Sequence, residues 1–388
     1  MQTFLTYTFF ALILLVINSY ILYPVFIYIL SILFKKKIEI SNESYPQVSI
    51  LISAYNEEKV IEKRVQNILN SNYDMDKIEI LVGSDCSNDR TNEILKNLEN
   101  AIPQLRVFIF NARRGKAGVL NDLVDYARNE ILIFTDANTE FHQDAIKKMV
   151  QYFNDKRVGG VSGRLELVET HEHIKEGVEE KRYWQYETIL KKSEGKLGIL
   201  IGANGGIFAI RKSLFVKVPL DKPVTDDFFI SLNVIKQGYW LIYEPEAVAF
   251  EYVARDVKTE FRRKVRFAAT NFQTISFFRD LLFNKNIILS YAFWSHKIIR
   301  WFLPFILILL FIVNVLIFEQ HLFFKYLLYL QVIVYGLGLI GYLFSKIKIR
   351  IGIISLISYF LITNLALLIG YFKFLRKKHS LIWQSTPR

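Results

Sequence analysis

Residues 48–58, VSILISAYNEE, show the pattern that decides the fold, because a run of seven mostly apolar residues ends abruptly in polar ones. The pattern recurs along the chain and predicts four strands, at 48–54, 78–83, 105–110 and 130–135. Amphipathic stretches between them predict helices at 57–69, about 89–98 and about 116–128. Strands that alternate with helices predict an α/β fold with a doubly wound, mostly parallel sheet and helices on both faces.

The polar residues after each strand are the first place to look for a site, because open α/β sheets bind ligands at the carboxyl ends of their strands. These ends read YNEE (55–58), SDCSND (84–89), NARRGK (111–116) and DAN (136–138). The sequence has no G-x-G-x-x-G fingerprint and no Walker lysine loop, which argues against dinucleotide and P-loop sites.

Two strand ends carry acids that are candidates for binding a ligand. Asp136 ends the fourth strand, and Asn138 follows two residues later. Their hard oxygen ligands suit Mg²⁺ or Mn²⁺ bridging a diphosphate, although Asp136 as a simple turn cap is an equally plain explanation. Asp85 is placed to accept a hydrogen bond from a base or ribose, whereas Asp89 is better explained as the cap of the next helix.

Basic residues follow the third strand. Arg113, Arg114 and Lys116 precede a predicted helix, where cations and free backbone N–H groups together favour phosphate. A solvated basic loop is the alternative.

Two further pairs of charged residues lie later in the chain. Asp226 and Asp227 stand at a predicted helix start, and adjacent carboxylates that raise each other's pKa suit a general base, although acids also cap helices. Arg263 and Arg266 share one helical face, which fits either a diphosphate leaving group or the surface of anionic lipid.

Hydrophobic segments flank this middle region. Residues 1–34 contain no Asp, Glu, Lys or Arg and end at three lysines, so we predict an uncleaved membrane anchor with its carboxyl end in the cytoplasm, and a cleaved signal peptide is the alternative. Three more apolar runs lie at 301–318, 322–344 and 349–372. The basic turn 345–350 is expected on the cytoplasmic side, but simple alternation then puts the basic tail 373–388 outside. Either one run is re-entrant or interfacial, or the tail is an exception; we expect a cytoplasmic tail.

The net charge of +12 does not require a nucleic-acid partner, because much of the excess lies beside apolar segments, where it matches anionic lipid. The single cysteine, Cys86, excludes an intrachain disulfide framework and a multi-cysteine zinc site. A reducing compartment fits this composition.

Taken together, these stretches resemble the membrane members of glycosyltransferase family 2 that include hyaluronan, cellulose and poly-N-acetylglucosamine synthases. The resemblance runs from about residue 48 to the tail, with Cys86 where glycine is usual, Asn138 in place of a second acid, and Phe267 in place of tryptophan. The ending WQSTPR at 383–388 is similar to a W-x-x-T-x-R ending in some members and supports a cytoplasmic tail.

The resemblance implies a nucleotide-sugar-binding domain of the GT-A type and assigns roles to residues. It implies that Asp227 is the base with Asp226 beside it, and that Asp136 and Asn138 hold the metal. The residues it implies for donor binding are Tyr55, Asn56, Glu57, Asp85, Arg114, Lys116, Asp136, Arg263 and Arg266. The residues it implies for the acceptor side are Asn204, Gly205 and Gly206.

These expectations combine into one organisation: a membrane anchor (1–38), a cytoplasmic GT-A domain (39–284), an interfacial segment (285–300), a transmembrane region (301–372) and a basic tail (373–388). We expect a multi-pass protein of the plasma (inner) membrane that uses Mg²⁺ or Mn²⁺ and transfers sugar from a UDP-sugar with inversion. We expect the acceptor to be a growing polysaccharide or a lipid-linked sugar, and the resemblance is compatible with accessory export proteins.

The alternatives are transfer of one sugar to a polyprenyl phosphate or other lipid, and, outside enzymes, a transporter or a nucleotide-binding scaffold. A transporter would need functional ionisable residues in its spans, and the runs 1–34, 301–318 and 349–372 contain essentially none.

Overall fold

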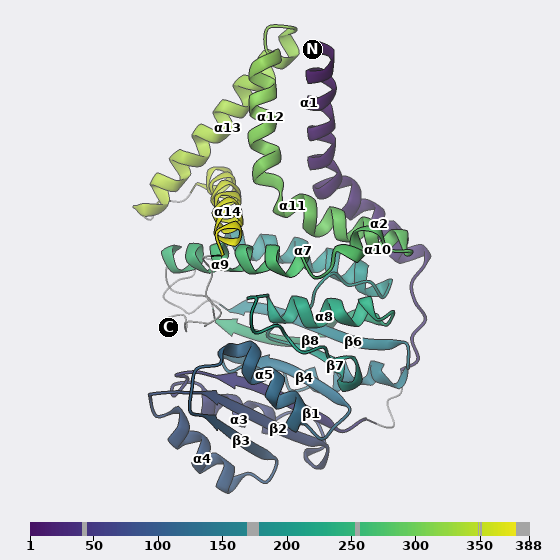
Figure 1. Cartoon of the computed structure of the whole chain (residues 1–388), viewed down its shortest axis with the longest axis vertical. Coiled ribbons are helices and arrows are strands. Elements are labelled where there is room, and N and C mark those ends of the chain that lie inside the picture. Colours follow the sequence, from purple (N-terminus) through teal and green to yellow (C-terminus); the bar gives the residue numbers. More distant parts are fainter. Residues whose placement is uncertain (41–44, 169–177, 253–256, 348, 350, 378–388) are drawn as a thin grey trace.

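A computed structural model describes residues 1–40, 45–168, 178–252, 257–347, 349 and 351–377. A sheet flanked by helices forms one end of the molecule, and long apolar helices form the other (Figure 1). The tail beyond 377 and the basic residues 348 and 350, on which the expected topology depends, lie outside the described residues.

In the described part of the chain the sheet has eight strands, in the order β3-β2-β1-β4-β7-β6-β8-β5. Its strands are β1 (Val48–Ala54), β2 (Ile78–Asp85), β3 (Leu105–Phe110), β4 (Ile131–Asp136), β5 (Thr139–Phe141), β6 (Val158–Val168), β7 (Phe208–Arg211) and β8 (Trp240–Tyr252). The first four are parallel neighbours, as predicted from the sequence. Beyond β4 the sheet is mixed, because β7 runs antiparallel to β4 and to β6.

Parallel pairing brings the ends of β1, β2 and β4 to one edge. Ser53 on β1 pairs with Asp136 on β4, and Ala54 on β1 pairs with Ser84 on β2. Asp85 and Asp136 therefore leave the sheet on either side of the β1 end.

Helices cover both faces of the sheet. They are α3 (Ile61–Leu69), α4 (Thr91–Ala101), α5 (Gly115–Tyr126), α6 (Ala145–Val150), α7 (Val178–Lys196), α8 (Asp226–Lys236) and α9 (Val257–Ile275). The second and third predicted helices correspond to α4 and α5, and their predicted ends lie within three residues of the observed ones. The first predicted helix corresponds to α3 and ends at Leu69 as predicted, but its predicted start at residue 57 was wrong. That helix begins at Ile61, because Asn56 takes a positive φ of 54° and the chain turns before the helix starts.

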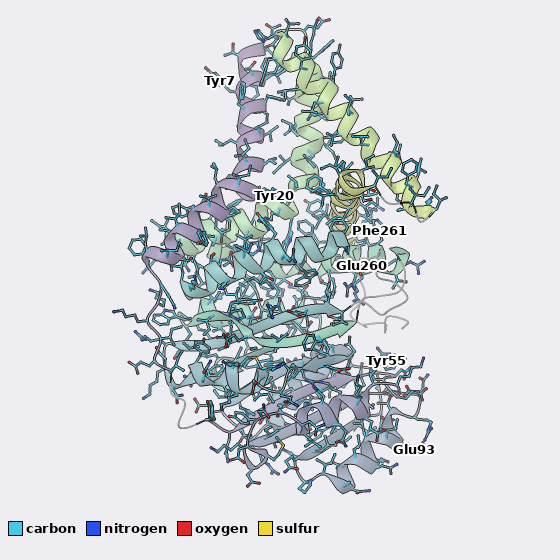
Figure 2. All side chains as sticks on the ribbon, turned by 180° about the vertical axis from the view of Figure 1, so that it is seen from behind. Tyr7, Tyr20, Tyr55, Glu93, Glu260 and Phe261 are labelled. Carbon is cyan, nitrogen blue, oxygen red and sulfur yellow. The ribbon has the colours of Figure 1, made fainter. Side chains whose placement is uncertain are left out.

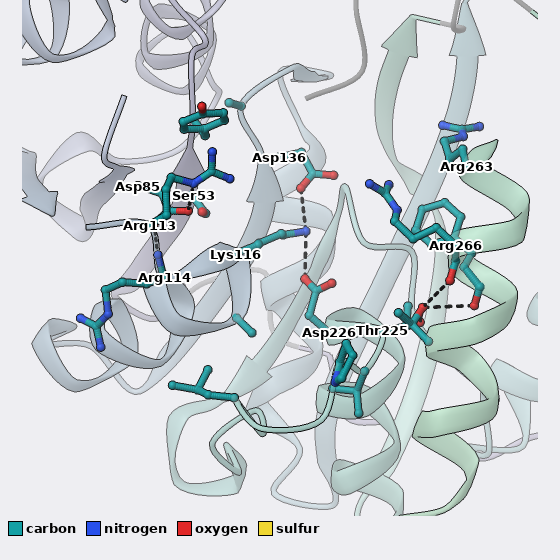
Figure 3. Close-up of a pocket in the computed structure, with 18 of the residues that line it drawn as sticks. Ser53, Asp85, Arg113, Arg114, Lys116, Asp136, Thr225, Asp226, Arg263 and Arg266 are labelled. Atoms are coloured by element: carbon teal, nitrogen blue, oxygen red, sulfur yellow. Dashed lines mark hydrogen bonds and ion pairs between the residues drawn. The ribbon is translucent and has the colours of Figure 1, made fainter. Parts of the chain in front are cut away.

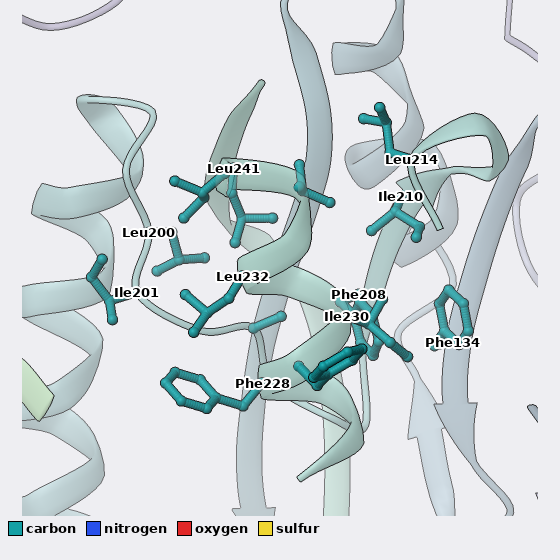
Figure 4. Close-up of a cluster of buried hydrophobic side chains, with 14 of the residues drawn as sticks. Phe134, Leu200, Ile201, Phe208, Ile210, Leu214, Phe228, Ile230, Leu232 and Leu241 are labelled. Atoms are coloured by element: carbon teal, nitrogen blue, oxygen red, sulfur yellow. The ribbon is translucent and has the colours of Figure 1, made fainter. Parts of the chain in front are cut away.

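Side chains alternate between the two faces of the sheet along each strand, and this creates an apolar core on each face. Leu51, Leu132 and Phe134 point to one face, whereas Ile50 and Ile133 point to the other. Figure 4 shows part of the first core, where Phe134 stacks on Phe208 with ring centroids 4.7 Å apart. Strands buried on both faces explain the nearly continuous apolar runs of the sequence.

The apolar end consists of long helices. They are α1 (Gln2–Ile17) with its π-helical turn η1 (Asn18–Leu22) and α2 (Tyr23–Leu33), then α12 (Leu303–Ile317), α13 (Leu322–Lys346) and α14 (Gly352–Leu375). Among the described residues, three helices are long and apolar enough to cross a membrane, namely Gln2–Leu33, α13 and α14. Tyr7 projects from α1 into the surroundings and is 71% exposed, as expected of a lipid-facing side chain (Figure 2).

The predicted interfacial segment 285–300 is mostly helical and precedes a bend. It contains α10 (Ile287–Ala292), a π-helical segment η6 (Phe293–Ile298) and α11 (Ile299–Trp301). The chain then bends by 67° before α12, and Pro304 lies in the first turn of that helix. At 15 residues α12 is too short to span by itself, so it forms a fourth candidate crossing only together with the helices before it.

The last helix has a different direction from the others. Figure 1 shows α14 almost end-on, whereas α1 and α12 run along the molecule. Its Gly370 packs directly on α9, because a Cβ at that position would lie 2.4 Å from the Cβ of Ala268. This arrangement favours the interpretation that one apolar run lies along the interface, and the topology stays a prediction.

The backbone conformation at position 86 is one that favours glycine. Cys86, where the resemblance leads one to expect glycine, has a positive φ of 58°. A side chain with a Cβ is strained in that region, typically by about 1–2 kcal/mol.

We therefore expect Cys86→Gly to stabilise the protein by about 0.5–1 kcal/mol, since part of the relieved strain is offset by the entropy of glycine in the unfolded chain. The shift of the thermal unfolding midpoint in detergent measures this. Cys86→Ala keeps the Cβ and should bring no such gain; equal stabilisation by both variants would contradict the argument.

Candidate functional site

A cavity opens at the strand ends of β1, β2 and β4, with the start of α8 and the helix α9 on its opposite side (Figure 3). Its lining is strongly charged. The charged residues that line it are Glu57, Asp85, Arg113, Arg114, Lys116, Asp136, Asp226, Glu251, Arg263 and Arg266. Residues separated by up to about 200 positions in the sequence therefore meet in one cavity.

Lys116 lies at the centre of the cavity between two acids (Figure 3). Its ammonium is 2.8 Å from Oδ1 of Asp136 and 2.9 Å from Oδ2 of Asp226. Burial lowers the pKa of Lys116, but the two carboxylates outweigh it and raise that pKa well above its usual value. Lys116 is therefore charged at all physiological pH values.

Asp85 organises the loop before α5. Its carboxylate accepts hydrogen bonds from the backbone N–H groups of Arg114 (2.6 Å) and Gly115 (3.0 Å) and from Nε of Arg113 (3.0 Å). The guanidinium of Arg113 also stacks on the ring of Tyr55, 3.3 Å from its centroid. Tyr55 and Arg113 thus form a flat wall of the cavity, suited to a nucleoside base.

Two predicted donor residues have other partners. The guanidinium of Arg114 pairs with Asp122 and points away from the cavity centre, so Arg113 is the arginine of this loop that faces inward (Figure 3). Asn56 is not part of the described cavity lining, because its side chain accepts from the N–H of Asn88 and joins the ends of β1 and β2. Glu57 does line the cavity.

The two adjacent acids at the start of α8 face different surroundings. Asp226 faces the cavity and Lys116, whereas Asp227 is not among its described lining residues and lies against Gly205. A Cβ on Gly205 would lie 2.8 Å from Oδ2 of Asp227, so the loop at 204–206 packs directly on this carboxylate. Burial and the neighbouring charge of Asp226 raise the pKa of Asp227 to about 6. Such a carboxylate suits proton transfer near neutral pH.

The predicted acceptor loop at 204–206 is fixed by contacts of the buried Asn204 side chain. The side chain of Asn204 is buried and donates to the carbonyl of Gly163 (2.6 Å) while its oxygen accepts from Lys191. Asn204 therefore positions the loop and does not face the cavity. Gly206 packs against Thr139, and its carbonyl accepts from Thr135.

The basic face of α9 closes the cavity. Arg263 and Arg266 both line it, which favours the leaving-group interpretation over a purely lipid-facing role. Burial, with Arg263 adding to it, lowers the pKa of Arg266. Phe267 lies beside them in the lining and is 41% exposed. The Thr225 hydroxyl lies 2.7 Å from that of Thr270, which ties the start of α8 to α9.

Sequence reasoning missed several lining residues. Glu251, at the end of β8, lies 3.8 Å from Arg263, and Thr270 follows Arg266 by one helical turn. Spacing on one helical face was an available signal for Thr270, but nothing local marks Glu251. Arg113 stood in the recognised basic loop without being chosen as a donor residue.

The strand-end pair fits a divalent cation only with help from a ligand. Asp136 already attracts a cation, Lys116, and Asn138 lines the same cavity. Among the described residues no group of three or more His, Cys, Asp or Glu side chains is arranged to hold a metal. One carboxylate and one amide oxygen leave most coordination positions to a bound diphosphate and water, which is the usual way in which Mg²⁺ is held beside phosphates.

The α/β sheet brings acidic and basic side chains together in one cavity at its strand ends. Residues 49–218 match the family model described as Glycosyl transferase family 2, so this part of the chain is similar to family 2 glycosyltransferases.

Relatives of known description agree with this class. The chain is similar to the probable glycosyltransferase YdaM of Bacillus subtilis, with 28% identity over 240 residues that cover 58% of this chain and 55% of that protein. It is also similar to the poly-beta-1,6-N-acetyl-D-glucosamine synthase of Staphylococcus aureus, with 27% identity over 239 residues that cover 60% of this chain and 56% of the synthase. The similarity thus spans about half the length of these relatives.

A solved structure supports the fold. The mannosyltransferase PcManGT from Pyrobaculum calidifontis, in complex with GDP-Man and Mn²⁺, superposes with a TM-score of 0.72 and covers 96% of this chain and 100% of its own. At 21% identity this likeness confirms the GT-A type fold with its apolar helices.

Proposed function

We propose that this protein is an inverting membrane glycosyltransferase that takes sugar from a UDP-sugar and elongates a cell-surface or extracellular polysaccharide. The observation that carries the proposal is the single cavity in which Lys116 meets Asp136 and Asp226 opposite Arg263 and Arg266. A diphosphate carries charge that this set of cations neutralises, and Tyr55 with Arg113 offers a surface for the base.

The residues divide the work of the transfer. Asp136 and Asn138 would hold Mg²⁺ or Mn²⁺, which when bound neutralises charge on the departing diphosphate. Lys116, Arg263 and Arg266 bind the diphosphate oxygens, and Asp227 accepts the proton of the acceptor hydroxyl. The loop at 204–206 lies against that carboxylate and forms the acceptor side.

The similarity to a poly-N-acetylglucosamine synthase supports a polysaccharide product. Membrane helices next to α9 also support an acceptor that arrives at the bilayer surface, either as a chain end or as a lipid head group. Transfer of a single sugar to a polyprenyl phosphate or other lipid is therefore the competing proposal. It is favoured by the apolar character of the described spans, in which the buried polar residues of α12 and α14 are Asn314, Ser358 and Asn364.

A product assay separates the two proposals. Detergent-solubilised protein is incubated with membrane lipid, divalent cation and a panel of labelled UDP-sugars, with GDP-mannose as an additional donor. We expect label from one UDP-sugar in a high-molecular-weight product that a matching glycosidase digests. Label that stays organic-extractable and one sugar long would establish the lipid transferase instead, transfer only from GDP-mannose would overturn the UDP donor, and no transfer from any donor would count against the enzyme.

The raised pKa of Asp227 predicts a pH dependence. A base must be ionised, so kcat/KM should be constant above pH 7 and fall as pH drops through about 6, where Asp227 becomes protonated. A pH–rate profile at saturating cation tests this. A profile that stays flat down to pH 4.5 would contradict Asp227 as the base.

A further inference from the structure

A buried lysine, Lys191, lies behind the acceptor loop at 204–206 and belongs to none of the motifs predicted from the sequence. It stands on α7, where only 6% of its surface is exposed. Its ammonium donates to Oδ1 of Asn204, and the next residue of that loop, Gly205, packs on the Asp227 carboxylate. Lys191 and Asp227 therefore lie on two sides of the same short loop, close enough for each to affect the charge of the other.

The carboxylates on the Lys191 helix already have other partners. Glu187 and Glu194 lie one turn before and one turn after Lys191, and both are buried. His296 on η6 lies between them, with Nε2 2.7 Å from Glu187 and Nδ1 2.6 Å from Glu194. Each ring nitrogen of His296 therefore contacts one of the two carboxylates.

Two cations also contact this group. Lys297 and Arg300 each lie 3.3 Å from Glu187. The two glutamates thus have partners other than Lys191. Besides Glu187 and Glu194, the acid whose charge acts on Lys191 is Asp227, across the loop.

The other charges around Asp227 have opposite effects. Asp226, its neighbour on α8, disfavours a second negative charge, whereas Lys116 on α5 and Lys191 on α7 favour it. Lys116 is held between Asp136 and Asp226 and is expected to turn to the diphosphate when the donor binds. Lys191 is buried on the far side of the loop, outside the described lining of the donor cavity.

We propose that Lys191 is a positioning residue for the transfer, which holds the acceptor loop against Asp227 and keeps this carboxylate ionised. The inference rests on the proposed role of Asp227 as the base. Burial lowers the pKa of Lys191 to about 8, so the lysine is still charged at pH 6–7, where Asp227 titrates.

The test compares pH–rate profiles of Lys191→Met and Lys191→Gln with that of the wild type. Loss of a neighbouring positive charge should move the acid limb of kcat/KM upward by about one pH unit, because one nearby opposite charge typically shifts a carboxyl pKa by about 1–3 units. Lys191→Arg keeps the charge and should keep the limb. UDP affinity should change less than twofold, since Lys191 is not part of the described donor cavity.

Lys192→Met is the matched control, because it makes the same change one residue along, on the exposed side of α7. It should leave the profile unchanged. Lys191→Gln retains a hydrogen-bond donor to Asn204, so it serves if the methionine variant fails to fold, as judged by thermal unfolding and UDP binding.

A folded, less active Lys191 variant with an unmoved acid limb would overturn the proposal, and so would full activity with an unmoved limb. Failure of the base assignment itself looks different: in that case the wild-type acid limb near pH 6 is absent, or Asp227→Asn leaves it in place, whatever Lys191 does.

Discussion

Asp136→Ala is expected to abolish divalent-cation-dependent turnover and to weaken donor binding, while the domain stays folded. The carboxylate stands at the end of a central strand in the cavity, and a single acid carries most of the protein's share of the cation site. Folding should survive, because the residue is at the cavity surface and Lys116 keeps its second partner, Asp226.

Turnover with Mg²⁺ or Mn²⁺ and calorimetric binding of UDP with and without cation provide the measurement. Asp144→Ala removes a partly exposed acid eight residues further along, outside the described lining of the cavity, and serves as the control. Near-normal turnover of Asp136→Ala in either cation would show that Asp136 is not a ligand, and the catalytic assignment would lose its main support.

The second large effect is expected at Asp227. Asp227→Asn keeps the shape of the side chain but cannot accept a proton, so turnover should fall by about 10²- to 10⁴-fold, the range typical for loss of a general base. UDP affinity should change little, because Asp227 lies on the acceptor side against Gly205 and not in the described lining of the donor cavity.

Asp226→Asn is the informative comparison. Asp226 is paired with Lys116 in the cavity, so its carboxylate is engaged on the donor side. We therefore expect its loss to weaken donor binding more than the chemical step. If Asp226→Asn instead removes the acid limb and Asp227→Asn does not, the two roles must be exchanged.

The assignments of individual residues remain proposals, but their positions can be compared with the sequence. Lys116, Asp136, Arg263 and Arg266 do share one cavity, as expected from motifs at strand ends and on one helix face. Asn56, Arg114 and Asn204 were also chosen from motifs, yet their side chains are bound to Asn88, Asp122 and Gly163 respectively. A motif locates a loop, but it does not determine which of several neighbouring polar side chains turns inward.

The sequence alone determined the four parallel strands, the strand-end location of the site and the apolar segments at both ends, because each depends on local periodicity and on the length of apolar runs. Only the tertiary structure decided the mixed half of the sheet, the direction of α14 and the contacts of Lys191 and Glu251. These features depend on which distant segments pack together. Burial and charge at such a contact, as at Asp227 between Asp226 and the loop at 204–206, arise from residues far apart in the chain, so no local pattern can encode them.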